Sequence, residues 1–427
     1  MSEKTPLMQH PRPLYAWAIL ILSVIFNAYS FTLQSVPGLK VLVGDSPEKL
    51  IDYVYAMSGF FYAFTLFQIP IGLLIDRFGS RVLPTAGIFL CALGAICFSQ
   101  STTSWQMGLS RFIMGAGGAF SFLNALKLIS NWFQPKRFAY LLGMFVALGT
   151  LLIVFLRLLF TKLSLVLDWR GALLSYGLGG LIFACIFFFV VQDIPGSRYT
   201  VHGLLENKKR FWDDIKGIFN NAQVWIIGIA VGLIIGPLFS FEALWSVPFL
   251  ETVYKVPQSL AILFNFFFVI GYAIGAVFFG RVSTSLGRRK ILIPWGIGFS
   301  LLMMIIILYP PYMGVQVTAI SFFTLGFAAS IVNLGFVSIH EQNPPHVTAT
   351  AVGVVNTFYA FFAAISQSLI GVFLQLGQKM EHSQGFSTHA YQISLIRLPV
   401  YLLIALIFSF FIKETYCKQV TKTNENT

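Results

Sequence analysis

The sequence contains few charged residues, and this shortage excludes an ordinary soluble protein. Only 10% of its 427 residues are Asp, Glu, Lys or Arg, whereas 57% are hydrophobic and the mean hydropathy is +0.78. A chain of this composition lacks the polar groups that a folded surface needs in water. We therefore expect an integral membrane protein.

Cysteine is scarce as well. Three of the four cysteines, Cys91, Cys97 and Cys185, lie inside apolar runs, and Cys417 is near the C-terminus. None has the spacing of a metal or redox motif, so we interpret them as packing residues. We expect no disulfide framework, no metal site and no cofactor.

Motifs of enzymes and pumps are missing. The sequence has no His-x-x-Glu-His segment, no paired carboxylates inside an apolar run and no Cys-His cluster. His340 and His346 flank a predicted turn with Glu341, which is typical of a loop rather than of a zinc site. A phosphate-binding loop is also absent, which excludes an ATP-driven pump. We expect a protein that is not an enzyme.

Long apolar runs dominate what is present. A bilayer core of about 30 Å needs about 20 apolar residues per helix, and twelve runs have a suitable length: 14–36, 51–75, 82–99, 105–129, 138–160, 172–191, 224–250, 259–279, 291–308, 315–339, 347–376 and 393–412. They are uninterrupted rather than alternating, so they predict helices and exclude a barrel. The predicted fold class is an all-α membrane protein with twelve transmembrane helices.

The basic residues indicate the orientation of these helices. The net charge is +12, but Lys and Arg are spread over short loops instead of gathering on one nucleic-acid-binding surface. Most of them fall in loops on one side when both termini are placed in the cytoplasm, as the positive-inside rule requires. We expect a multi-pass protein of the bacterial inner membrane with both termini cytoplasmic and no cleaved signal peptide.

The chain divides into two halves at its longest predicted cytoplasmic connection. We expect a cytoplasmic tail at 1–13, a six-helix bundle at 14–192, a central loop at 193–223, a second six-helix bundle at 224–412 and a tail at 413–427. Within the central loop, residues 211–219 predict either a short amphipathic helix on the membrane surface or a plain linker.

An internal repeat relates the halves. The segments at 72–81 and 280–290 each place two glycines seven residues apart before an arginine, and Gly280 follows Gly72 by 208 residues. An Ala-x3-Gly spacing recurs at 139–143 and 349–353, which are 210 residues apart, and Ser-Val-Pro ends spans one and seven. Repeats at nearly one offset predict two bundles related by a pseudo-twofold axis.

The first of these segments, 72–81, resembles the loop signature of the major facilitator superfamily, and Arg111 with the glycines after it resembles the family's second signature. With segments 64–72, 131–139 and 168–170, the chain is similar to the branch of bacterial phagosomal nutrient transporters, which carry metabolites and amino acids. The resemblance implies the major facilitator fold and alternating access around a central site. The glycine-proline signature of the family's antiporters is missing from 141–160, which argues against drug efflux.

The repeated loops predict a cytoplasmic gate. Gly72 would allow a close helix approach, Gly79 would make the turn, and Asp76 would cap or pair across the halves when this side is closed. Thr284 stands at the position of Asp76 in the second half, so its gate would lack that charge. Alternatively, the charges only set the topology. The gate candidates are Gly72, Asp76, Arg77, Gly79, Arg81, Gly280, Gly287 and Arg289.

Ionisable residues inside a membrane are costly and therefore suggest function. Glu242 is the only carboxylate well inside a span, which makes it the first proton-coupling candidate, with Arg111 as a second. The alternatives are a fixed ion pair of Glu242 with Arg157 or Arg111, and a structural Arg111 that binds backbone carbonyls. For the other basic residues in the spans, the alternative to a functional role is a side chain that extends to the membrane interface, as could occur at Lys127, Arg157 and Arg397.

Polar residues on apolar helices predict a substrate cavity, although each is individually more typical of helix packing. The candidates are Asn27, Gln34, Asn124, Lys127, Arg157, Asn265, Asn333, Asn356 and Tyr359. The basic excess in the spans favours an anionic or zwitterionic substrate.

These patterns together predict a secondary active transporter of a small polar metabolite, an amino acid or organic acid, that works by alternating access and proton-coupled import. The alternatives are import of a carboxylate siderophore, which would need a wider cavity, an efflux antiporter or a channel. We expect a monomer whose partners are the small-molecule substrate, protons and membrane lipid, with no nucleic acid.

Overall fold

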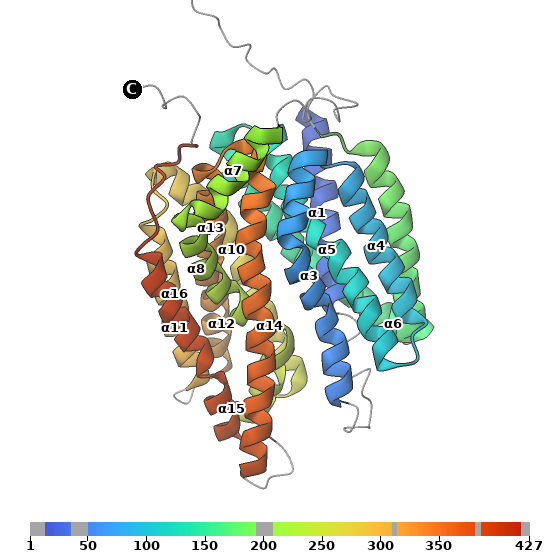
Figure 1. The fold of residues 1–427 in the computed structure, drawn as a ribbon. Helices are drawn as coiled ribbons and strands as arrows, with labels where there is room; N and C mark the ends of the chain where they lie inside the picture. Colours follow the sequence, from blue (N-terminus) through green and yellow to red (C-terminus); the bar gives the residue numbers. More distant parts are fainter. Residues whose placement is uncertain (1–12, 36–49, 194–207, 310–313, 381–385, 420–427) are drawn as a thin grey trace, which may run out of the picture.

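The computed structural model describes residues 13–35, 50–193, 208–309, 314–380 and 386–419, and within them every regular element is helical (Figure 1). The predicted tail at 1–13, apart from its last residue, and parts of the central loop and C-terminal tail lie outside the described residues. Absence of strands in the described chain agrees with spans that satisfy their own backbone hydrogen bonds in lipid.

The N-terminal half comprises α1 (Pro13–Ser35), α3 (Leu50–Phe78), α4 (Val82–Ser99), α5 (Ser104–Trp132), the short η2 (Pro135–Arg137) and α6 (Phe138–Val190). Thr103 and Gln106 form a capping box that starts α5, which satisfies backbone donors at the helix start. Gly79, at φ +89°, makes the turn between α3 and α4.

Helix α6 is two membrane passes joined at a sharp break. Asp168 has a left-handed φ of 59° there, and its carboxylate accepts a hydrogen bond of 2.8 Å from the Gly171 amide. The two arms pack against each other, and a hydrogen bond of 2.5 Å from the Tyr176 hydroxyl to the Leu156 carbonyl joins them. The arms correspond to the predicted spans five and six.

The amphipathic segment between the halves forms helix α7 (Lys208–Asn220), so the helix rather than the plain linker is present. The C-terminal half follows with α8 (Ala222–Ser240), the π-helical η3 (Phe241–Trp245), α9 (Ser246–Val253), α10 (Gln258–Leu286), α11 (Leu292–Leu308), α12 (Val315–Ala329), η4 (Ser330–Val332), α13 (Asn333–Gln342), η5 (Pro345–Val347), α14 (Thr348–Met380), α15 (Thr388–Leu395) and α16 (Arg397–Ser409).

The number of membrane passes matches the sequence prediction. Ten helices of the described chain are long and apolar enough to cross a membrane, and α11 is a shorter apolar helix. With both arms of α6 counted, these helices supply the twelve predicted passes. The predicted helical membrane fold is therefore confirmed.

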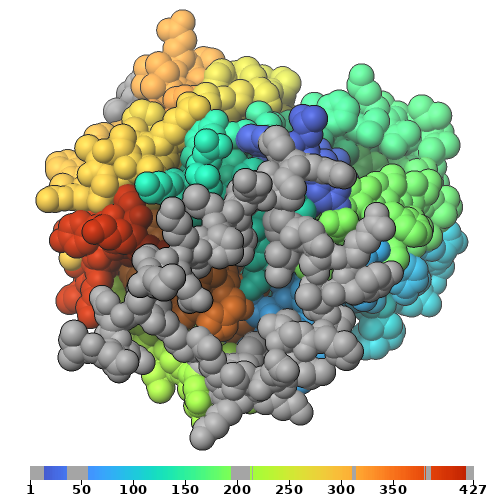
Figure 2. Space-filling view, turned by 90° about the horizontal axis from the view of Figure 1, so that it is seen from above, coloured from blue at the N-terminus to red at the C-terminus, as the bar shows by residue number. Residues whose placement is uncertain are grey.

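The two halves stand side by side and meet along two helix pairs, α3 with α14 and α6 with α10. Helix α7 and the start of α1 lie at one end of the bundle, which we call the α7 end, and α15 lies towards the other (Figure 1). Figure 2 looks onto the α7 end and shows orange α14 beside light-blue α3, and yellow α10 beside the teal start of α6.

Repeated glycines explain how closely these pairs approach at the α7 end. A Cβ atom added to Gly72 would lie 2.7 Å from the Ala349 carbonyl oxygen, and one added to Gly280 would lie 2.6 Å from that of Ala139. One turn further along, Gly143 lies against Ala276 and Gly353 against Gln68 in the same way. The repeated Ala-x3-Gly spacing thus marks two equivalent helix contacts, as is usual where small residues let membrane helices approach.

Candidate functional site

A cavity of about 180 Å³ lies between the halves. Residues of α1, α3, α6, α8, η3, α10 and α14 line it, so both halves contribute to its wall. Its polar lining includes Gln34, Ser35, Thr150, Arg157, Ser240, Glu242, Tyr359 and Gln367. A cavity at this interface is reached from one side or the other when two bundles move against each other.

An ion pair connects the halves inside this cavity. Arg157 Nη1 on α6 lies 3.7 Å from Glu242 Oε1 on η3. Arg157 Nε also donates to Ser35 Oγ at 2.9 Å, and the Asn265 amide donates to the Glu242 backbone carbonyl at 2.7 Å. The Arg157 side chain is 33% exposed but that of Glu242 only 9%, so the arginine is the accessible member of the pair.

The local backbone places Glu242 on an irregular turn. Pro237 sits inside α8, where it cannot donate the usual helical hydrogen bond, and residues 241–245 then form a π-helical turn. Single π turns within α-helices are frequent at functional sites because they shift side chains out of regular helical positions.

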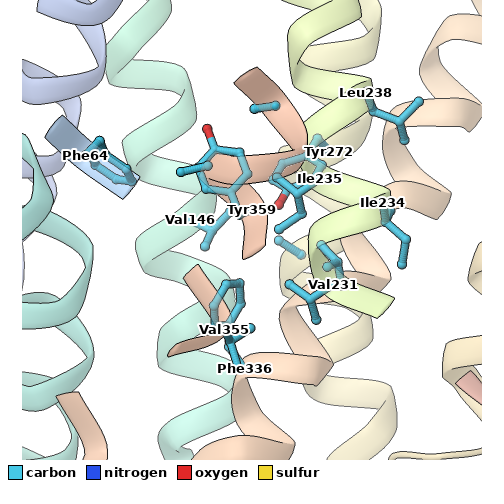
Figure 3. Packing of buried hydrophobic residues seen from close by; sticks show 14 of the residues in the cluster. Phe64, Val146, Val231, Ile234, Ile235, Leu238, Tyr272, Phe336, Val355 and Tyr359 are labelled. Carbon is cyan, nitrogen blue, oxygen red and sulfur yellow. The ribbon is translucent and has the colours of Figure 1, made fainter. Parts of the chain in front are cut away.

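A second cavity of about 90 Å³ adjoins the first, and we call it the deeper cavity because its residues lie nearer the α7 end. Asn27, Asn333, Asn356, Tyr272 and Tyr359 contribute its amides and most of its hydroxyls. The Asn333 amide donates to Ser330 O at 2.8 Å, and the Asn356 amide to Gln68 Oε1 at 3.0 Å. Figure 3 shows Tyr359, Tyr272, Val146 and Phe336 converging on this region from different helices.

At the α7 end, Asp76 connects α3 to the start of α14. Its carboxylate lies 2.6 Å from Lys127 Nζ and accepts hydrogen bonds from the backbone amides of Ala349, at 3.2 Å, and Thr350, at 2.7 Å. The Thr350 hydroxyl donates to it as well, at 2.8 Å. A carboxylate at a helix N-terminus satisfies free amides and interacts favourably with the helix dipole.

Lys127 also bridges the halves. Its ammonium group donates to the backbone carbonyls of Pro345, at 3.2 Å, and His346, at 2.9 Å. Both Asp76 and Lys127 are buried, so the pair is held away from water at a junction of the halves. In this conformation the α7 end is closed.

The equivalent region of the second half has a different charge arrangement. Arg289 Nη2 lies 2.8 Å from Glu341 Oε1, and its Nη1 donates to Ser283 at 2.5 Å and Thr284 at 3.0 Å. Glu414 accepts the Arg289 backbone amide at 2.7 Å. All of these residues belong to the C-terminal half, so this cluster does not link the halves.

The remaining gate candidates shape the turns. Arg81 Nε donates to Phe188 O at 2.8 Å, Arg77 lies 5.2 Å from the Phe78 ring centroid, and Gly287, at φ +65°, ends α10. Asp193 accepts from the Ser80 amide. Burial raises the pKa of the Asp193 carboxyl group. The backbone amides of Ser80 and Arg81 and the positive charge of Arg81 oppose this rise.

Four candidates line neither cavity, and one of them, Asn265, donates to the Glu242 backbone carbonyl as described. Lys127 is at the α7 end as described. Asn124 is fully buried, and its amide atoms have no hydrogen-bond partner among the described residues. Arg111 is buried, donates to the Leu33 and Gln34 carbonyls and lies 4.8 Å from the Phe98 ring centroid, which is the structural arrangement left open by the sequence.

Sequence reasoning missed several lining residues. Ser240 and Tyr272 line the cavities, and Thr350 binds Asp76, but none was among the candidates. The position of Ser240, two residues before the intramembrane Glu242, was a usable signal. Tyr272 follows Asn265 by two helical turns, which is a weaker one.

Comparisons with known proteins identify the class. The family model described as Major Facilitator Superfamily matches residues 15–367, most of the chain. The chain therefore belongs to the major facilitator superfamily, a family of transporters, and it is not an enzyme.

Individual relatives are distant. The chain is 24% identical over 362 residues to a "Probable L-galactonate transporter" of Escherichia coli K12, covering 80% of this chain and 76% of the relative. It is 25% identical to a "Probable galactarate/D-glucarate transporter" of Bacillus subtilis, covering 74% and 76%. With an uncharacterised transporter of Bacillus subtilis, 25% identical, the match spans about half of each chain, 48% and 49%.

Solved structures share the fold. The proton:xylose symporter XylE, 13% identical, aligns with a TM-score of 0.71 over 95% of this chain and 98% of its own. A bacterial homolog of the human lysosomal transporter Spinster, 15% identical, aligns with a TM-score of 0.62 over 96% and 100%. The predicted major facilitator fold is confirmed at this level, whereas the resemblance to the phagosomal nutrient branch stays a prediction.

Proposed function

We propose that this chain imports a small organic anion together with a proton, and that the substrate carboxylate replaces Glu242 as the partner of Arg157. The observation that carries the proposal is the Arg157–Glu242 ion pair, which joins the two halves inside the central cavity. An arginine can bind a carboxylate through two parallel hydrogen bonds, and one that is a third exposed is accessible to an entering anion.

Replacement of Glu242 provides the coupling. Once the substrate carboxylate occupies Arg157, the buried Glu242 carboxylate loses its counterion in a low-dielectric site. An unpaired buried charge is costly, and a carboxyl group avoids the cost by taking up a proton. Substrate and proton then bind together, and a monovalent anion with one proton crosses the membrane without net charge.

The gate contacts supply the alternation. Closure of the α7 end by Asp76 and Lys127 leaves the cavity to be reached from the other end. Neutralising the ion pair between Arg157 and Glu242 loosens a contact between the halves in the centre, which favours rearrangement at the α7 end. With the α7 end on the predicted cytoplasmic side, this cycle carries the anion inwards.

The relatives support an organic anion. Two of them are named as probable transporters of galactonate and of galactarate or glucarate, all organic acids. The cavity volume supports a small substrate over a carboxylate siderophore, because about 180 Å³ is less than the 300–1,000 Å³ typical of sites for drug-sized ligands. An amino acid, the other predicted class, stays as an alternative for the uptake assay. We further infer a monomer in a bacterial inner membrane.

The test is uptake into proteoliposomes under an imposed inward proton gradient, with labelled organic acids, amino acids and neutral sugars supplied in parallel. We expect gradient-stimulated uptake of organic acids by the wild type, and none that responds to the gradient in Glu242→Gln. Glu251→Gln, a half-buried glutamate that lines neither cavity, serves as the matched control and should behave as the wild type.

Arg157 is tested in the same assay. Arg157→Gln should abolish organic-acid uptake, whereas Arg397→Gln should not, because Arg397 donates to carbonyls of its own helix region, Ile393 and Ser394. Preferential uptake of neutral sugars, or organic-acid uptake that persists in Arg157→Gln, would contradict the proposal.

A further inference from the structure

The two cavities form one elongated site. Phe31, Thr150, Ile153, Phe239 and Tyr359 line both of them, so the charged part and the deeper part share a wall. A substrate bound to Arg157 at one end has its remaining atoms directed along this wall towards the asparagines of the deeper part. The site therefore suits a linear molecule better than a compact ring.

Charge is confined to one end of this site. Among the described residues that line either cavity, Arg157 is the one Lys or Arg, and Glu242 is the one acid. The deeper part carries amide and hydroxyl groups, from Asn27, Asn333, Asn356 and two tyrosines. A second carboxylate placed there would lose its hydration without gaining a cation, which is costly in a buried site.

Ser240 adds an unsatisfied hydrogen-bonding group. The residue is 4% exposed and lines the charged part, and its Oγ has no hydrogen-bond partner among the described residues. A buried hydroxyl without a partner is unfavourable, and it favours any ligand that can donate to it or accept from it. Ser240 is the last residue of α8 and lines the same cavity as Glu242, two residues further along the chain.

We propose that the substrate is a linear, polyhydroxylated monocarboxylate, with its carboxylate on Arg157 and its hydroxyl groups bound by Ser240 and the amide-lined deeper cavity. This inference rests on the proposed function, since it assumes that an organic anion is carried. It predicts that a sugar monocarboxylate is preferred over a sugar dicarboxylate of the same length, because the dicarboxylate places a second charge among neutral amides. It also rejects an aliphatic acid, which would leave the amides and hydroxyls unpaired.

The experiment compares labelled six-carbon acids of matched length in proteoliposomes under a proton gradient. One set consists of epimeric polyhydroxy monocarboxylates (gluconate, galactonate and mannonate), and the others are the dicarboxylate glucarate and the hydroxyl-free hexanoate, with the liposome leak subtracted. We expect at least one polyhydroxy monocarboxylate to be taken up about tenfold faster or more than glucarate and hexanoate.

Two variants test the hydroxyl-reading groups. Ser240→Ala should raise the KM for the preferred monocarboxylate several-fold, because Ala removes the hydroxyl without opening a large void, and should reduce its preference over hexanoate. Tyr272→Phe should act in the same direction at the deeper end. Ser300→Ala removes a buried serine that donates to its own helix at Gly296 O, so it should leave the preference unchanged.

The outcomes distinguish this inference from the proposed function. Arg157-dependent uptake in which glucarate or hexanoate equals the polyhydroxy monocarboxylates would overturn the inference alone. A preference that is unchanged in both Ser240→Ala and Tyr272→Phe would also overturn it. Failure of all these acids to enter, while amino acids or neutral sugars do, would overturn the proposed function.

Discussion

The two contacts that close the α7 end are related by the internal repeat but differ in their chemistry. Between α3 and α14, Gly72 packs against Ala349, and the buried Asp76 and Lys127, which pair within the N-terminal half, each bind backbone groups of the C-terminal half. Between α10 and α6, Gly280 packs against Ala139 in the same manner, but Thr284 replaces the aspartate. The helix packing is thus shared by both contacts, while a buried ion pair that binds the other half is present in one.

The buried ion pair of the second region makes its hydrogen bonds within the C-terminal half. Arg289 pairs with Glu341, and the groups that do cross to α6 are of another kind. The His340 ring stacks on Phe138 at 3.8 Å, and the Arg281 guanidinium lies 4.6 Å from the Tyr140 ring. The difference indicates that opening the α7 end removes hydrogen bonds of a buried ion pair only on the α3–α14 side, where most of the energetic cost of opening should lie.

The largest effect is expected from Asp76→Asn. The change leaves Lys127 buried without its anionic partner, and breaking a buried pair in this way typically costs about 3–5 kcal/mol. The closed α7 end should therefore become the minor state, and uptake should fall strongly. The population of the closed state is measured with a single cysteine introduced at the α7 end, from its accessibility to a membrane-impermeant reagent.

Thr284→Val is the matched comparison for Asp76→Asn. Thr284 binds Gly280 O and accepts from Arg289 within its own half, so we expect little change in accessibility or uptake. An effect as large as that of Asp76→Asn would show that the two contacts do not differ in the way described.

Gly72→Ala and Gly280→Ala test the shared part of the comparison. Each adds a methyl group within 2.6–2.7 Å of a carbonyl oxygen on the opposite half, and overpacking of this kind typically costs about 1–3 kcal/mol. We expect similar shifts towards the open α7 end from both, measured with the same cysteine accessibility.

Gly179→Ala is the control for these glycine variants, because a Cβ at that position has no atom within 4 Å. It should leave the accessibility unchanged. If only one of Gly72→Ala and Gly280→Ala opened the α7 end, the two packing contacts would not be equivalent.

Arg281→Gln should have the smallest effect. The side chain is exposed, and its contacts are a 3.1 Å hydrogen bond to the Tyr140 hydroxyl and a cation–π contact with the same ring. Such exposed contacts are worth about 1 kcal/mol or less. A slight rise in cysteine accessibility, with uptake nearly unchanged, is the expected result, and loss of transport would place more of the gate on the α10–α6 side than we infer.

Much of the fold could be predicted because lipid imposes simple rules. Span lengths follow from bilayer thickness, and the offset between Gly72 and Gly280 already related the halves. The close helix approach at Gly72 was predicted because glycine has no side chain, but its partner on the other half was not. The absence of charge at Thr284 could likewise be read from the repeat.

The arrangement of the site depends on contacts between distant segments, and there the sequence was insufficient. Angular positions on an isolated helix could not show that Lys127 meets Asp76 rather than the cavity. Two partners were left open for Glu242, because the choice between Arg157 and Arg111 is made by how α5 and α6 pack. The π-helical turn at 241–245 has no sequence rule behind it, so the local backbone that carries Glu242 was not predicted.

The central claim is that an entering carboxylate displaces Glu242 from Arg157 and that Glu242 then takes up a proton. The most direct test is to add a polyhydroxy monocarboxylate to the purified protein in weakly buffered detergent solution near neutral pH and to measure the protons absorbed. We predict about one proton per bound anion for the wild type, and none for Glu242→Gln with binding retained. Anion binding without proton uptake in the wild type, or equal uptake in Glu242→Gln, would contradict the account.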